Sequence, residues 1–237
     1  MAVAGNNLRW VPGLIVERTE DVDDEGRAKS VQESWVRLHA GDDGEPVSEL
    51  MKLIKDGKDE TEKGKREEAE RRAKAEEAKR RMREHEAKSG AGKPGPGGDR
   101  EQNDGKSNVT LRFGGPTPFD PEVQDSVSYH RLDGGERPPG GTGVAYEFAL
   151  QTAEGVTLQG TAWLAAGTGI PLEMQFTTAP LPKRVKEMSA SVRFGTGADG
   201  AWWPAEVSFT AMGKFLLFKK RFRSSMTFSE YWWREPR

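Results

Sequence analysis

The stretch from Trp202 to Trp233, WWPAEVSFTAMGKFLLFKKRFRSSMTFSEYWW, indicates the fold more clearly than any other part of the chain. In its second half, Phe222, Met226 and Phe228 occupy even positions, and the odd positions are basic or carry hydroxyl groups. A period of two is typical of a strand that buries one face. We therefore predict two long strands around a turn near Gly213–Lys214, forming the closing edge of an antiparallel meander.

The same alternation predicts strands over most of the remaining chain, separated by turns rich in Gly and Asp. Three are expected before residue 56, at Leu14–Asp23, Lys29–His39 and Pro46–Ile54. Six more precede the closing pair, at Val109–Phe113, Val123–Leu132, Gly143–Gln151, Val156–Ala165, Leu172–Phe176 and Val185–Phe194. No helical pattern between them could form the crossovers that parallel strands need. The predicted fold is therefore all-β (mainly), a single antiparallel sheet of about eleven strands.

A highly charged segment interrupts the strands. From residue 56 to about residue 88 the chain consists mostly of Glu, Lys, Arg and Ala, and many Glu residues precede an Arg or Lys by four positions, as Glu68 precedes Arg72. This spacing favours an exposed helix, and the few apolar residues form no continuous stripe that a core could bury. The segment is predicted as an insertion at 56–106, a charged helix plus a Gly/Pro-rich linker. One β domain is then formed by 1–55 and 107–237, and a helical-bundle partner is the alternative for the helix.

The amino-acid composition of the chain argues against several classes of function. Lys and Arg together number 36 and Asp and Glu 38, and this balance argues against a nucleic-acid binder. The chain has no Cys, so disulfides, thiolate metal sites and a cysteine nucleophile are excluded. No apolar run is long enough for a transmembrane segment. The N-terminus lacks the features of a signal peptide, which fits a cytoplasmic protein or an exported one whose signal has been removed.

Few residues point to catalysis. The sequence has no Gly-x-Ser-x-Gly elbow, and His39, His85 and His130 lack the spacing of metal ligands. The Gly-Thr-Gly sequences at 167–169 and 195–197 stand between predicted strands, which is typical of hairpin turns rather than phosphate loops. We therefore expect a protein that is not an enzyme and has no cofactor or metal. A hydrolase assembled from scattered residues remains the less favoured alternative.

Aromatic and other apolar residues gather in the predicted strands, so one sheet face is strongly apolar and must be covered. It could fill its own interior, hold an apolar ligand, or pack on another chain. For the ligand hypothesis, the candidate binding residues are Trp163, Met174, Phe176, Met188, Val192, Phe194, Phe209, Phe222, Met226 and Phe228. Lys219, Arg221 and Arg223 form a candidate basic rim for anionic head groups, although a solvated strand face also explains them.

Three segments resemble a known family. They are GTAWLAAGTGIPLEMQF at Gly160–Phe176, PLPKRVK at Pro180–Lys186 and KFLLFKKRFRSSMTFSEY at Lys214–Tyr231. Together they resemble the bacterial outer-membrane lipoprotein-sorting (LolA/LolB-like) superfamily, across about residues 14–55 and 107–233. The resemblance implies a strongly curved antiparallel half-barrel in the periplasm of a diderm bacterium, whose concave face receives acyl chains. The charged insertion differs from the carrier proteins of that family.

These observations together lead to one functional expectation. We expect a non-catalytic, periplasmic module of the cell envelope that binds lipid acyl chains or a lipidated protein on its apolar sheet face. The alternative is an envelope scaffold whose apolar face packs on a partner chain. A cytoplasmic location is the alternative to the periplasm.

Overall fold

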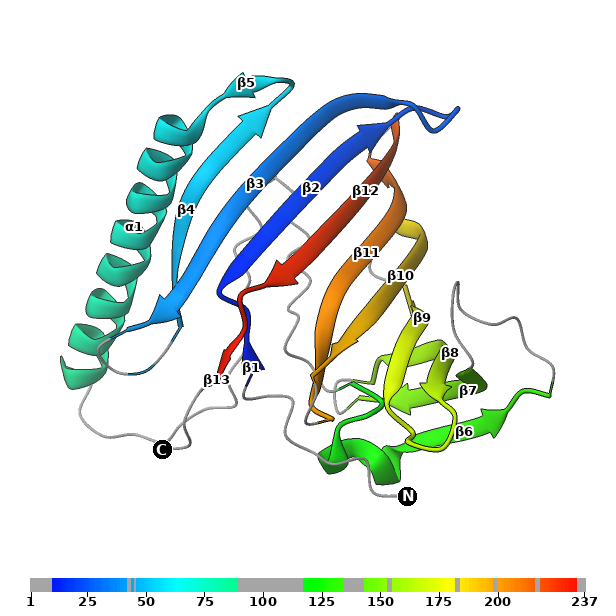
Figure 1. The fold of residues 1–237 in the computed structure, drawn as a ribbon. Coiled ribbons are helices and arrows are strands. Elements are labelled where there is room, and N and C mark those ends of the chain that lie inside the picture. Colours follow the sequence, from blue (N-terminus) through cyan, green and yellow to red (C-terminus); the bar gives the residue numbers. More distant parts are fainter. Residues whose placement is uncertain are drawn as a thin grey trace. The chain divides into compact units, whose positions relative to one another are not determined.

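The computed structural model describes residues 10–41, 44, 46–88, 117–133, 143–152, 155–181, 184–197, 200–215 and 218–233. The chain divides into two compact units, one formed by residues 1–61 with 116–237 and the other by residues 62–115. The first unit is built on an 11-stranded antiparallel sheet. This sheet confirms the predicted mainly-β class, and it is not closed into a barrel (Figure 1).

The large sheet contains strands β2 (Leu14–Val22), β3 (Ala28–Ala40), β4 (Pro46–Lys55), β5 (Lys58–Asp59), β6 (Val127–Arg131), β7 (Gly143–Gln151), β8 (Thr157–Ala165), β9 (Pro171–Ala179), β10 (Val185–Thr196), β11 (Trp202–Phe215) and β12 (Phe218–Ser229). Two very short strands, β1 (Trp10–Val11) and β13 (Trp232–Trp233), pair separately. The predicted strand at Val109–Phe113 lies outside the described residues.

The strand order places the two ends of the chain's β domain in the middle of the sheet. The order is β5-β4-β3-β2-β12-β11-β10-β9-β8-β7-β6, so the last long strand, β12, pairs with β2, the first strand of the large sheet. In Figure 1, β12 (red) lies between β2 (blue) and β11 (orange). The prediction that the closing hairpin forms an edge is therefore wrong. Strand periodicity carries no information about which strands pair, and the edges are β5 and β6.

Two predicted boundaries also differ from the structure. Gly213 and Lys214 lie within β11, where they pair with Lys220 and Lys219, so the hairpin connection follows Phe215. Residues 123–126, predicted as the start of the strand Val123–Leu132, instead belong to the 3-10 helix η2 (Pro121–Ser126). Proline fixes φ near the helical value and lacks the N–H that a sheet ladder requires, which explains the difference.

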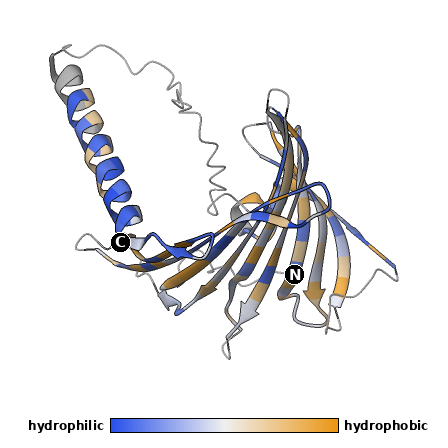
Figure 2. Cartoon of the chain, turned by 90° about the horizontal axis from the view of Figure 1, so that it is seen from above, coloured by the Kyte–Doolittle hydropathy of each residue, from blue (hydrophilic) through white to orange (hydrophobic). Residues whose placement is uncertain are grey.

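The only helix longer than one or two turns in the described chain is α1 (Thr61–Lys88). It begins later than residue 56, because Asp56 and Gly57 form a turn into β5. Asp59 Oδ1 then accepts a hydrogen bond of 2.9 Å from the Thr61 backbone N–H, which caps the start of the helix. Figure 2 shows α1 as mostly hydrophilic, and within the described residues no helix is long and apolar enough to cross a membrane.

The core lies on one side of the large sheet, towards β7–β11. Its buried residues are Phe119, Phe148, Ala162, Met174, Val192, Trp202 and Val207. Phe119 precedes η2 and meets Phe194 and Trp202 edge-on, with ring centroids 5.6 and 5.9 Å apart. Tyr129 and Gln124 both donate hydrogen bonds to the Pro118 carbonyl, which holds the segment before η2 in place.

The topology predicts how the segment 62–115 can be replaced. Phe119 is held against β10 and β11, while Thr61 follows β5, five strand spacings from β11, which is roughly 25 Å. A Gly/Ser linker of about 25 residues has a typical reach of about 28 Å. We expect this replacement to leave cooperative thermal unfolding near the midpoint of the intact chain.

A linker of about five residues reaches at most roughly 18 Å and should lower the midpoint sharply. Circular dichroism of both variants checks the expectation. If the long-linker variant no longer unfolds cooperatively, the segment 62–115 contributes to the fold of the β unit and the expectation is wrong.

Candidate ligand-binding face

The pairing register sorts the strand side chains into two faces. One row runs across the sheet through Ala162, Met174, Val192, Val207 and Met226. Side chains two residues along each strand point to the same side. We call this side of the sheet the apolar face, and the side that carries Arg18, Glu20, Glu33 and Arg223 the charged face.

Nine of the ten predicted ligand-binding residues share the apolar face: Met174, Phe176, Met188, Val192, Phe194, Phe209, Phe222, Met226 and Phe228. Trp163 does not, because it pairs with Ala145 and Glu173 on the opposite side. Ala162 and Leu164, on either side of Trp163 in β8, lie on the apolar face. Because successive residues of a strand point to opposite sides, alternation in the sequence already places Trp163 on the other face. Trp163 therefore lies on the opposite face of the sheet from the other nine residues.

Part of the apolar face is filled by the chain itself. Met174 and Val192 belong to the buried core, and Phe176, Phe194 and Phe228 pack against it. Phe119, only 3% exposed, covers this region. Sequence reasoning missed Phe119, because it lies in a Pro-rich segment without strand alternation. For these five predicted residues the self-filled core is therefore the better description.

The other four predicted residues lie beyond that core cluster, on β10–β12. Phe209 and Phe222 are in contact, with ring centroids 5.3 Å apart. Phe209 is 3% exposed, whereas Met188, Phe222 and Met226 are half-buried. Half-buried apolar side chains on an open sheet leave apolar surface that a ligand can cover.

Polar groups border this region on the same face. Thr19 pairs with Ser224, and Glu17 pairs with Met226. The Thr19 hydroxyl lies 3.2 Å from the Ser224 hydroxyl, and both hydroxyl groups donate to Glu17 Oε1, at 3.3 and 3.5 Å. Ser34, which pairs with Glu17 from β3, is also buried. Sequence reasoning could not identify this group, since it forms only when β2 pairs with β12.

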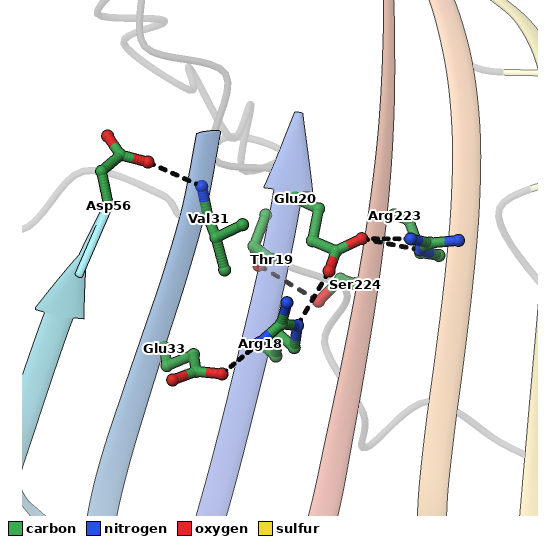
Figure 3. A network of polar contacts seen from close by, with 8 residues as sticks. All are labelled: Arg18, Thr19, Glu20, Val31, Glu33, Asp56, Arg223 and Ser224. Atoms are coloured by element: carbon green, nitrogen blue, oxygen red, sulfur yellow. Dashed lines mark hydrogen bonds and ion pairs between the residues drawn. The ribbon is translucent and has the colours of Figure 1, made fainter. Parts of the chain in front are cut away.

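The charged face carries the predicted basic rim, and an ion-pair network occupies part of it (Figure 3). Arg223 donates two hydrogen bonds to Glu20 Oε2, one of them 2.9 Å long. Arg18 donates to Glu20 Oε1 at 2.8 Å and also binds Glu33. Two guanidinium groups are thus matched by two carboxylates, which leaves little excess positive charge for an anionic head group at Arg223.

The remaining rim residues add little to such a site. The Arg221 guanidinium lies 3.7 Å from Met212 Sδ, and the Lys219 side chain lies outside the described part. Arg221 and Arg223 are on the charged face, away from Met188, Phe222 and Met226. A ligand lying on the apolar face would therefore not reach them directly.

Within the described ranges, no group of three or more His, Asp or Glu side chains is placed to hold a metal ion. His39 and His130 are exposed strand residues on β3 and β6.

The environment of Glu20 predicts a pH dependence of stability. Its side chain is 9% exposed, and hydrogen bonds from Arg223 and then Arg18 hold the pKa of Glu20 below its ordinary value. Because the folded pKa is the lower one, this contribution is complete above about pH 5 and is lost as the pH falls through the folded pKa. We expect Glu20→Gln to lower the free energy of unfolding at pH 7 by about 1–2 kcal/mol.

The Glu20→Gln variant should also lose less stability than the parent between pH 5 and pH 3, as urea unfolding would measure. Glu187→Gln, an exposed residue of β10, is the matched control and should behave as the parent. Equal acid sensitivity in the parent and in Glu20→Gln would show that the network does not stabilise the fold.

Comparison of the chain with protein-family models, curated proteins and solved structures finds no significant match. Function is therefore inferred from the residues of the chain itself.

Proposed function

We propose that the protein is a non-catalytic binding module that holds the acyl chains of a lipid, or of a lipidated protein, on its apolar face. The observation that carries the proposal is the half-buried group Met188, Phe222 and Met226, which lies on an open sheet beyond the self-filled core. Burial of apolar surface contributes roughly 25 cal/mol per Å². An alkyl chain laid over these side chains would supply that burial.

The sheet itself supports this use of the apolar face. Phe209, Ala190 and Ala211 are buried on the same face, beside the half-buried residues. Methionine side chains adapt to ligands of different shape, and two of the three half-buried residues are methionines. We further propose that the open sheet is a half-barrel of the lipoprotein-sorting type, and that the protein acts in the periplasm of a diderm cell envelope.

Binding of the neutral apolar fluorophore N-phenyl-1-naphthylamine tests the proposal. We expect the parent to enhance its fluorescence, and Met226→Gln to weaken binding several-fold because a polar amide then occupies the apolar face. Met51→Gln is the matched control, since Met51 is 42% exposed on β4 and should not affect binding.

Native mass spectrometry of protein purified from a diderm host gives a second readout. A retained lipid supports the proposal, while a co-purifying protein without lipid favours the envelope-scaffold alternative. If the parent does not bind the fluorophore, or if Met51→Gln weakens binding as much as Met226→Gln, the apolar face is not a lipid site.

A further inference from the structure

We propose that the ligand of the apolar face is an amphiphile with a primary ammonium group. Its alkyl chain lies over Met188, Phe222 and Met226, and its ammonium group lies at Glu17, Thr19 and Ser224. The inference rests on the proposed function and names the chemical class of the ligand.

Glu17 places a carboxylate on the apolar face. This carboxylate is half-buried on the apolar face and pairs across the strands with Met226. Its partners within the described chain are hydroxyl groups at 3.3 and 3.5 Å, and no cation there lies within ion-pair distance. A partly buried carboxylate favours a cationic partner. Glu17 therefore selects a positive head group.

Glu20, on the same strand, is a carboxylate whose negative charge is matched by two cationic side chains. It lies on the charged face, where Arg18 and Arg223 both donate hydrogen bonds to it. Asp21, another acid of β2, is paired with Lys220 at 3.1 Å. Glu17 differs from both neighbours, because its contacts leave its negative charge unmatched.

The side chains around Glu17 offer several hydrogen-bond acceptors. A primary ammonium group carries three hydrogen-bond donors and no acceptor. Glu17 supplies carboxylate oxygens, and the hydroxyl oxygens of Thr19 and Ser224 lie beside it. These oxygens can accept all three N–H groups. An anionic head group would instead face the carboxylate at short range and be repelled.

Polar and apolar side chains follow one another along the apolar face of β12. Ser224 lies between Phe222 and Met226 on the same face, and Met226 is the cross-strand partner of Glu17. From Met226 to Phe222 the strand covers about 13 Å, with Met188 beyond on β10. An alkyl chain that runs from Met226 to Phe222 would cross Ser224 and would meet apolar side chains on either side of it.

Isothermal titration calorimetry with three probes of equal chain length tests the inference. Dodecylammonium, dodecanol and dodecanoate are compared at pH 7, below their critical micelle concentrations. We expect the parent to bind dodecylammonium about tenfold more tightly than dodecanol and to bind dodecanoate most weakly. Glu17→Gln should bring the affinities for dodecylammonium and dodecanol within about twofold of each other.

Two further variants separate charge recognition from a general loss of structure. Thr19→Val removes one acceptor and should lower dodecylammonium affinity a few-fold. Glu187→Gln removes one negative charge from the charged face and should leave all three affinities unchanged. Equal affinity of the parent for the ammonium and the alcohol, or an ammonium preference that survives Glu17→Gln, would overturn the inference and leave the lipid site intact. If none of the probes binds the parent, the proposed function itself fails.

Discussion

The pairing of β2 with β12 is the interaction on which the rest of the structure depends. It runs from the pair Val22–Arg221 to the pair Leu14–Ser229, and it joins the strands β2–β5 to the strands β6–β12 through two strands that lie about two hundred residues apart in the sequence. Without it, the chain would form two smaller sheets with additional edges. The Arg223–Glu20 and Arg18–Glu20 hydrogen bonds lie on the charged face of this seam, and the Thr19–Ser224 contact lies on the apolar face.

The pairing of β2 with β12 also places polar side chains next to apolar ones on the apolar face. Strands β10–β12 contribute Met188, Phe222 and Met226, while β2 contributes Glu17 and Thr19 directly beside them. An apolar surface that ends in hydroxyl and carboxylate groups suits a ligand with one apolar and one polar end. Arg18 and Arg223 lie on the charged face and are matched by acids, so they contribute to stability rather than to recognition of that ligand. Lys220 lies on the apolar face, where it is paired with Asp21.

The sequence predicted the individual strands well, because the period of two and the Gly- and Asp-rich turns are local signals. Strands β2–β4 and β7–β10 begin and end within a few residues of the predicted bounds. Pairing partners and edges could not be predicted, since alternation says nothing about neighbours. Phe119 was missed because its segment has no periodicity, and the importance of Glu17 depends on a contact with a strand that follows it by about two hundred residues. Trp163, in contrast, could have been assigned to the correct face by parity alone.

A cross-link at the β2–β12 seam tests this account most directly. The chain has no native cysteine, and the Thr19 and Ser224 hydroxyls are 3.2 Å apart, so cysteines at the two positions have the spacing of a cross-strand disulfide. Thr19→Cys with Ser224→Cys should oxidise to a monomer of increased mobility in non-reducing electrophoresis. Thr19→Cys with Ser225→Cys, which points to the charged face, should stay reduced. A Thr19/Ser224 pair that stays reduced, or that cross-links only between molecules, would contradict the central position of β12.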